Sequence, residues 1–405
     1  MDTRQKLDLL GRAAQYDDCV SSVSRVHPLA SPGSSHQEED FGLFALPADC
    51  SAGLDVFPYV SHITTPAGCR VAVLKVLQTN ACRNDCRYCA FRAGRDFRRA
   101  SLVPDELARA FDLMQRAGVV QGMFLSSGVV TTTHSMDEML ATAELLRERY
   151  RFRGYLHLKI LPGAEPAQIA RAVDLADRVS VNLEGPSPER LAALAPQKQM
   201  SKLIEPLHVA ARFIREHRRL GDRRAEYGHG RLGMSTQFVV GPAGESDREL
   251  LTTAQQLYRE VRLARAYYSA FSPVPGTPLE KVRPTDPRRE FRLYQADWLL
   301  RYYEFSVQEL PFDAGGGLAP GLDPKTAWAE AHPERFPVEV NRAPLSELLR
   351  VPGVGPVSAR AILAERRRGT LGELGDLRRL GALANRAAPY VLLGGKRPPH
   401  QLALF

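Results

Sequence analysis

Three cysteines lie within eight residues of one another in the segment TNACRNDCRYCAFR, residues 79–92. Cys82, Cys86 and Cys89 have the spacing C-x3-C-x2-C and make up half of the chain's six cysteines. Three thiolates brought together by one loop suit a [4Fe–4S] cluster in which one iron has no protein ligand. Such an iron can chelate a small molecule and pass an electron to it. The spacing therefore predicts an iron–sulfur redox centre.

A zinc site is the alternative for the same cysteines. Structural zinc sites are closed by four ligands, and Cys50 or Cys69 offers a fourth thiolate. Zinc sites mostly combine a C-x2-C pair with a distant second pair, a spacing that differs from the one here. The spacing favours the cluster and leaves zinc open by ligand count.

The cysteine segment follows the first of a series of alternating strand and helix patterns. Six β-rich runs are predicted, at 69–79, 120–129, 154–163, 178–185, 233–241 and 265–274. Helical patterns are predicted at 104–117, 136–150, 166–176, 201–218 and 247–262. Repeated βα units predict an α/β fold with a parallel sheet curled into a full or partial barrel. In such a barrel the carboxyl ends of the strands carry the chemistry.

With this motif after a strand, the sequence resembles the radical S-adenosylmethionine (SAM) enzymes. Their cysteine motif has an aromatic residue before the last Cys, which is Tyr88 here. The resemblance implies a partial (β/α)6 TIM-like barrel and a [4Fe–4S] cluster held by the three cysteines. It also implies that the open iron holds the amino and carboxylate groups of SAM, and that SAM is cleaved to a 5′-deoxyadenosyl radical.

Residues at other strand ends are candidates for contacts with SAM. Ser126, Ser127 and Gly128 stand where that family has a Gly-Gly-Glu-like stretch, although the acid is missing here. Asn182 and Glu184 end the fourth predicted strand, where polar side chains would face the ribose; strand-end capping is the alternative. Lys159 and Gln237 are further candidates on neighbouring strands.

Two tyrosines and two histidines of the predicted barrel also have side chains that could take part in chemistry. The run YYSAF ends the sixth predicted strand, and adjacent strand residues point to opposite faces, so only one of Tyr267 and Tyr268 can face the interior. That tyrosine is the catalytic candidate, to quench a substrate radical or stack on a base; a core tyrosine is the alternative. His157 and His208 are predicted to be packing residues.

A longer set of segments resembles one subgroup, the putative DNA modification/repair radical SAM proteins. The segments are KLDLLGRAAQYDDC, LKVLQTNACRNDCRYC, FLSSGV, SVNLEGPSPERLAALAPQK, STQFVVG and YYSAF. The subgroup is linked to uracil-DNA-glycosylase-like partners, and the resemblance implies such a partner and a low-potential electron donor. It leaves the substrate unassigned.

A short basic region follows the barrel. From Val338 to the end there are eleven Lys/Arg and five Asp/Glu, within a chain of formal charge +8. The segment LSELLRVPGVGPVSARAILAERR predicts two helices joined by a tight turn, with Gly353 and Gly355 leaving backbone N–H groups open to a phosphate. It resembles the helix-hairpin-helix DNA-binding motif. Four arginines on or just after the second helix favour DNA over a plain αα-hairpin: Arg360, Arg366, Arg367 and Arg368. Backbone contacts of this kind predict non-specific, salt-sensitive binding.

The last five residues, QLALF, resemble the peptide with which proteins dock on the bacterial sliding clamp. Leu402, Leu404 and Phe405 would enter apolar pockets and Gln401 would meet a polar rim. A tail that folds back on the barrel is the alternative.

The expected organisation has five parts. They are an N-terminal helix and loop (1–60), the radical SAM barrel (61–310), a Gly/Pro-rich linker (311–337), a small all-α helix-hairpin-helix domain (338–394) and a tail (395–405). No apolar run is long enough for a membrane span and the start has no secretory pattern, so a cytoplasmic protein is expected.

The leading interpretation is a radical SAM enzyme that modifies or repairs DNA, with the base extruded or in a single strand. The alternatives are an enzyme that modifies RNA or tRNA, and a non-catalytic Fe–S adaptor that recruits a repair partner.

Overall fold

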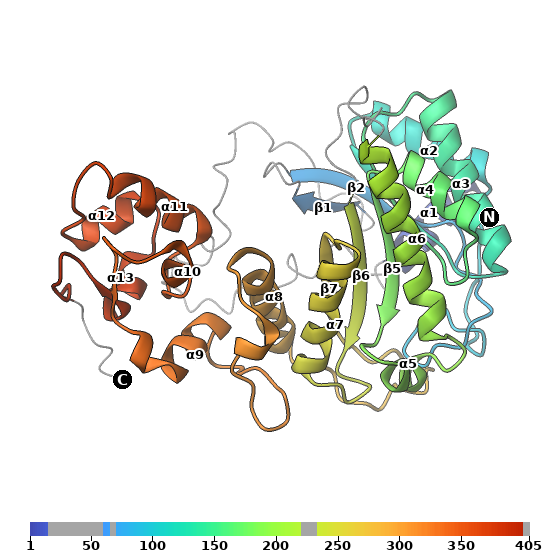
Figure 1. Cartoon of the computed structure of the whole chain (residues 1–405). Helices are drawn as coiled ribbons and strands as arrows, with labels where there is room; N and C mark the ends of the chain where they lie inside the picture. Colours follow the sequence, from blue (N-terminus) through green and yellow to red (C-terminus); the bar gives the residue numbers. More distant parts are fainter. Residues whose placement is uncertain (15–59, 65–69, 220–232, 400–405) are drawn as a thin grey trace. The chain divides into compact units, whose positions relative to one another are not determined.

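A computed structural model describes residues 1–14, 60–64, 70–219 and 233–399 of the chain (Figure 1). The chain divides into two compact units. The first comprises Met1–Glu245 and Gln256–Pro287, and the second comprises Ser246–Gln255 and Arg288–Phe405. None of the described helices combines the length and the hydropathy that a membrane span requires.

A seven-stranded sheet is the centre of the first unit. Its strands follow the chain order: β1 (Val60–Thr64), β2 (Arg70–Leu77), β3 (Gly122–Ser126), β4 (Tyr155–Lys159), β5 (Arg178–Glu184), β6 (Gly233–Val240) and β7 (Arg265–Ala270). β1 pairs antiparallel with β2, and every later neighbour is parallel. The six parallel strands are the six predicted ones, and β1 and β7 are the edges, so the sheet is an open, curled half-barrel.

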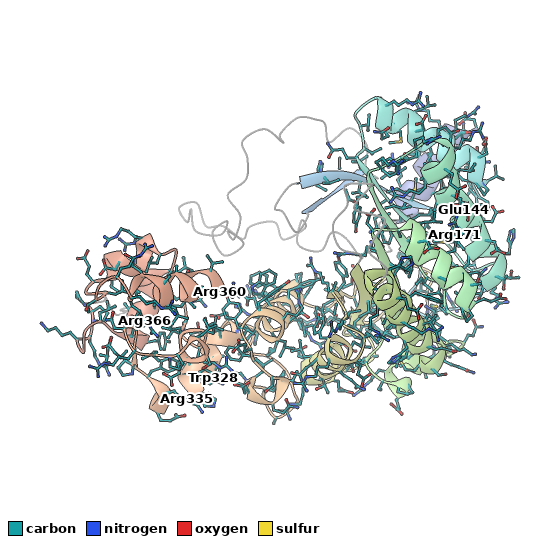
Figure 2. All side chains as sticks on the ribbon, turned by 45° about the horizontal axis from the view of Figure 1, so that its top comes forward. Glu144, Arg171, Trp328, Arg335, Arg360 and Arg366 are labelled. Carbon is teal, nitrogen blue, oxygen red and sulfur yellow. The ribbon has the colours of Figure 1, made fainter. Side chains whose placement is uncertain are left out.

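Helices connect the strands and cover one face of the sheet. They are α1 (Thr3–Ala13), α2 (Pro104–Arg116), α3 (Thr132–Glu144) with a π-helical turn (Leu145–Arg149), α4 (Pro166–Leu175), α5 (Pro188–Leu194), α6 (Met200–Arg219) and α7 (Asp247–Glu260). Figure 1 shows α2, α3, α4 and α6 along this face. An ion pair between Glu144 and Arg171 at 2.6 Å ties α3 to α4 (Figure 2).

Local signals in the sequence set where these helices begin. Pro104, Pro166 and Pro188 each occupy the first turn, where a missing N–H costs nothing. Glu165 caps α4 in a capping box with Gln168.

The two faces of the sheet differ in polarity because side chains alternate along each strand. The helix-covered face is apolar, with Leu74, Met123, Leu156 and Val179 fully buried. The other face, called the inner face below, is unusually polar. Its residues include Lys75, His157, Lys159, Arg178, Ser180, Asn182, Gln237, Tyr267 and Ser269.

The second unit is mainly helical. Its elements after α8 (Pro287–Tyr302) are α9 (Pro324–Ala331), β8 (Val338–Glu339), α10 (Leu345–Leu348), α11 (Pro356–Glu365), α12 (Leu374–Arg379), α13 (Ala384–Ala387) and β9 (Val391–Leu392), with short 3-10 turns at Val307–Glu309, Pro333–Arg335 and Ala388–Tyr390. β8 and β9 pair in parallel. One apolar core, which includes Leu348, Val351, Ile362 and Leu377, holds the four last helices together.

These four helices form two helix–turn–helix pairs, α10–α11 and α12–α13. Gly353 in the first turn and Gly381 in the second have nearly the same positive φ, 81° and 80°. The amide of Leu383 donates to the carbonyl of Gly353 at 2.8 Å, so the two turns are joined directly. The second pair corresponds to the segment GTLGELGDLRRLG and the residues after it.

The segment expected to be a linker, 311–337, differs from that expectation. It contains α9, whose Trp328 is 2% exposed, and it packs on the hairpin region. Lys325 donates to the carbonyl of Val354 at 2.5 Å, and Asp323 pairs with Arg386. The sequence did not reveal this order, because Gly and Pro make up a third of the segment and the residues that make its contacts are widely spaced.

Candidate functional site

The cysteine loop, residues 79–99, leaves the sheet directly after β2, and two polar side chains fix its base. Thr79 Oγ1 donates to the carbonyl of Ala100 at 2.9 Å. Asn80 donates to the carbonyl of Arg98 at 3.1 Å and accepts from the amide of Ala100 at 2.8 Å. The two ends of the loop are therefore fixed to each other just after the carboxyl end of β2.

Arg99 stabilises the loop from within. Its guanidinium donates to the carbonyls of Asn80, Arg92 and Arg95 at 3.0–3.3 Å. It also lies over the ring of Phe97, 4.3 Å from the centroid. The sequence reasoning missed this residue, because one arginine among many carries no signal of its partners.

The three cysteines lie on this loop as free thiols. Val129, just after β3, donates its amide to Cys82 Sγ at 3.4 Å, and Phe91 donates to Cys89 Sγ at 3.4 Å. Burial raises the pKa of Cys86, and burial together with Cys86 raises the pKa of Cys89 to about 12. Without a metal these two thiols hold their protons, and metal binding must release them.

The donor set fits a [4Fe–4S] cluster. Each cysteine of such a cluster binds a different iron, so the three thiolates surround the cluster and do not meet at one atom. Among the residues that the structure describes, no three Cys, His, Asp or Glu side chains are grouped around a point that would suit a single metal ion. Cys50 and Cys69, the candidates for a fourth zinc ligand, lie outside the described residues.

A buried ion pair supports the loop from the end of β5. Glu184 has a φ of 65°, at an irregularity in the pairing with β6 that turns its side chain toward the loop. Its carboxylate accepts from Lys198 at 2.9 Å and from the hydroxyl of Tyr88. Burial alone would lower the pKa of Lys198, but Glu184 and Cys86 outweigh burial and raise it. Lys198 therefore places a fixed positive charge beside the thiols.

Tyr88 and Glu184, both predicted to contact the cofactor, are hydrogen-bonded to each other in this arrangement. Glu184 was expected to face the ribose of SAM, and in the structure Lys198 and Tyr88 occupy its carboxylate. Lys198 was not singled out from the sequence, since nothing in its neighbourhood points to a partner fourteen residues away. The role of Tyr88 and Glu184 toward SAM stays a prediction.

Gly128 allows the end of β3 to approach the cysteine loop closely. A Cβ atom at this position would lie 2.2 Å from the carbonyl oxygen of Ala81. The Gly128 amide donates to the carbonyl of Thr79 at 2.7 Å. Ser126 is buried, and Ser127 Oγ donates to the carbonyl of Gly128 at 2.8 Å. The three predicted residues, Ser126, Ser127 and Gly128, thus lie against the cysteine loop. Gly128 is required there because a larger residue would collide with the carbonyl of Ala81.

A row of polar side chains crosses the inner face on three strands. Asn182 on β5 donates to Gln237 Oε1 on β6 at 3.1 Å, and Gln237 donates to Ser269 Oγ on β7 at 2.8 Å. The predicted candidates Asn182 and Gln237 are therefore direct neighbours. A hydrogen-bonded row of this kind can bind hydroxyl groups of a ligand without much rearrangement.

The tyrosine pair of β7 divides between the two faces, as strand geometry requires. Tyr267 lies on the inner face, where its hydroxyl accepts from Arg178 at 3.2 Å. Tyr268 is fully buried in the helix-covered core and stacks on Phe238. Of the two catalytic candidates, only Tyr267 lies on the polar face.

The histidines behave differently from each other. His157 is buried on the inner face, edge to face with Phe124 at 4.5 Å, and its Nε2 shares a hydrogen bond with Ser180 at 2.9 Å. Burial, Arg178, Lys159 and Lys75 hold its pKa well below the usual value. His208 was expected to pack, but it lies exposed on α6, because its position falls on the polar side of that helix.

The geometry is a three-cysteine loop at the carboxyl end of a strand in a curled, parallel half-barrel. A sequence model described as the radical SAM superfamily matches residues 76–257, which include all three cysteines. Residues 76–257 form a radical SAM domain. Enzymes of this superfamily use a [4Fe–4S] cluster and SAM, and the radical SAM domain provides the thiols for that cluster.

Curated relatives of this chain include tRNA-2-methylthio-N(6)-dimethylallyladenosine synthases from two strains of Thermus thermophilus. Each is 26% identical over 227 residues, which cover 56% of this chain and 46% of the relative. The chain thus spans less than half the length of these relatives.

Solved structures similar to the radical SAM domain include an FeFe-hydrogenase maturase, HydG, from Carboxydothermus hydrogenoformans, and methylornithine synthase (PylB). The first is 14% identical with a TM-score of 0.43, covering 55% of this chain and 50% of that structure. The second is 13% identical with a TM-score of 0.43, covering 55% and 60%.

Proposed function

We propose that this chain is a radical SAM enzyme that acts on DNA, modifying or repairing a base. The single observation that carries the proposal is the combination, in one chain, of the cysteine loop with a basic unit of two linked helix–turn–helix pairs. The first part supplies radical chemistry, and the second part suits a polyanionic, extended substrate.

In this proposal Cys82, Cys86 and Cys89 hold the cluster, which when bound supplies one electron to SAM. Lys198 and Glu184 keep the loop in place, and the positive charge of Lys198 favours the thiolate forms. The row of Asn182, Gln237 and Ser269 orients the ribose, and Ser126, Ser127 and Gly128 lie where the amino-acid part of SAM is expected. The enzyme needs a low-potential electron donor.

The second unit is proposed to grip DNA as a tandem helix-hairpin-helix domain. Gly355 is the N-cap residue of α11 and has an extended backbone. Pro356, in the first turn of α11, has no N–H group that would need a partner. Arg360 is exposed on α11, whereas Arg366 caps the carbonyls of Val340 and Ala343 at 3.1 and 2.6 Å. Figure 2 shows the two arginines well apart. Arg360 is thus the phosphate contact, and Arg366 is structural.

Anaerobic reconstitution tests the proposal. The full-length protein, loaded with iron and sulfide and supplied with dithionite, SAM and duplex or single-stranded DNA, should release 5′-deoxyadenosine, and the nucleosides of the DNA should change in mass. Cys86→Ser is the control for the cluster. A fully loaded protein that makes no more 5′-deoxyadenosine than Cys86→Ser contradicts the enzyme proposal, and product formation without any altered nucleoside contradicts DNA as substrate.

A tRNA or other RNA substrate is the second candidate, favoured by the name of the curated relatives. The same reaction with total tRNA in place of DNA distinguishes the two, because a modified nucleoside should appear in only one of the arms.

Two partners are proposed from the sequence alone. The tail residues Gln401, Leu402, Leu404 and Phe405, which lie outside the described residues, are proposed to bind a bacterial sliding clamp. A uracil-DNA-glycosylase-like protein is proposed to act with the enzyme. A clamp pull-down with Leu404→Ala/Phe405→Ala tests the first of these.

A further inference from the structure

Helix α8 presents aromatic side chains to solvent on one side. Leu293, Ala296 and Leu299 are buried. Phe291, Trp298 and Tyr302 are 36%, 39% and 46% exposed. Spacings of seven and four residues put these three rings on one face of the helix. Large aromatic residues exposed in a row indicate a binding surface.

The rings of this face are held in place and accompanied by positive charge. Trp298 and Tyr302 are 4.3 Å apart between centroids. The Arg301 guanidinium lies 5.4 Å from the Trp298 ring and 4.8 Å from the Tyr302 ring. It is fixed by the fully buried carboxylate of Asp297 at 2.8 Å. The two rings are tilted by 49° and pack on each other, so each has already lost part of its side-chain freedom before a planar group stacks on it.

The C-terminal end of α8 also lies against the first hairpin turn. The hydroxyl of Tyr303 is 3.4 Å from the point where a Cβ of Gly355 would lie. Arg350, just before the turn, donates to the carbonyl of Tyr303 at 2.8 Å and lies 3.8 Å from the ring centroid of Phe305. The aromatic face and the turn are therefore fixed to each other within one unit. Figure 2 shows Arg360 on the side of the hairpin region nearest α8.

We propose that Trp298 and Tyr302 form a stacking platform for unpaired nucleobases of a strand whose phosphates contact the turn at 353–355. This inference rests on the proposed function, since it takes the hairpin unit to bind nucleic acid. Base stacking on aromatic rings is the usual way to hold single strands without reading their sequence. Trp, Tyr and Arg are also enriched in protein interfaces, so the side chains alone do not decide the occupant. A nucleic-acid strand is favoured because this face and the turn at 353–355 belong to one unit. The platform would hold a strand in the unpaired state that base chemistry requires.

The test uses the full-length protein with a labelled oligothymidine, alone or annealed to oligodeoxyadenosine. Trp298→Ala/Tyr302→Ala should weaken single-strand binding by about 5- to 150-fold for each lost stack and leave duplex binding unchanged. Leu113→Ala, a change at an exposed hydrophobic residue of α2, should alter neither affinity. Arg360→Ala should weaken duplex and single-strand binding alike.

Tryptophan fluorescence gives an independent readout, because the chain has two tryptophans and Trp328 is 2% exposed. Oligothymidine should quench the emission of the wild type. Trp298→Phe should lose most of the quenching and keep most of the affinity, since it retains a ring.

Unchanged single-strand affinity in Trp298→Ala/Tyr302→Ala overturns the platform, as does an equal loss of duplex affinity. A shift in oligomeric state with unchanged oligonucleotide binding also overturns it, in favour of a protein contact. If Arg360→Ala leaves duplex binding intact while the double variant loses single-strand binding, the hairpin grip fails and the platform stands.

Discussion

Glu184 at the end of β5 and Lys198 in the connection between α5 and α6 form a buried ion pair, at 2.9 Å, beside the cysteine loop. Their side chains are 4% and 12% exposed, so neither charge is well hydrated. The pair therefore joins a backbone irregularity of the sheet to the placement of the thiols.

Removing one partner of this pair should be costly. Glu184→Gln leaves the Lys198 ammonium buried without a counter-charge, and we expect a loss of about 3–5 kcal/mol in the stability of the apo protein. Glu184→Gln combined with Lys198→Met should recover part of the loss. Denaturant unfolding of the apo wild type, both single variants and the double variant measures these effects; an additive double variant would show that the two side chains act independently.

Gly128→Ala should loosen the cysteine loop. The added Cβ would lie 2.2 Å from the carbonyl oxygen of Ala81, so the loop or the end of β3 must move. We expect a clear drop in iron bound per chain after reconstitution, by about half or more. Gly372→Ala, where the Cβ meets nothing within 4 Å, is the control. Equal iron content in the two variants contradicts this role for Gly128.

His157 should make the protein less stable in mild acid. Its pKa is lowered in the folded state, so below about pH 6.5 the unfolded chain binds a proton that the folded chain does not. The contribution of neutral His157 to the free energy of unfolding is complete above the pKa of the unfolded chain. As the pH falls below that value, the free energy of unfolding decreases by at most about 1.4 kcal/mol per pH unit. His157→Gln should flatten the decline between pH 6.5 and pH 5 in denaturant titrations of the apo protein. Parallel pH profiles for the two proteins would refute this assignment.

Changing Arg360 to Ala should affect DNA binding and not stability, whereas changing Arg366 to Ala should lower the stability of the fold. Arg360→Ala should keep the stability of the fold and reduce the slope of log affinity against log salt for duplex DNA by about 0.9. Arg366→Ala should cost about 1–3 kcal/mol, because two carbonyls lose their donor. Filter binding at several salt concentrations and thermal unfolding separate the two. A salt slope unaffected by Arg360→Ala removes this arginine from the interface.

The sequence predicted what depends on local pattern. The six parallel strands and the helices between them follow from periodicity and from Pro and capping residues at helix starts. The cysteine loop follows from its spacing, and the division of Tyr267 and Tyr268 follows from strand alternation. Each of these features is set by residues close together in the chain.

What escaped prediction depends on contacts between distant residues. β1 is a short edge strand whose pairing with β2 has no pattern of its own. The partner of Glu184 and the order of residues 311–337 are set by single long side chains, Lys198 and Lys325, that reach across the fold. The role of Gly128 is visible only when the carbonyl of Ala81 is in place.

The hydrogen bond from Leu383 to Gly353 has a consequence for how this protein can be shortened. Because the Leu383 amide in the second turn completes the first, a fragment that ends before Leu383 would lose a hydrogen-bond partner of the Gly353 turn. A fragment meant to keep the first turn in its native shape must therefore extend through both turns.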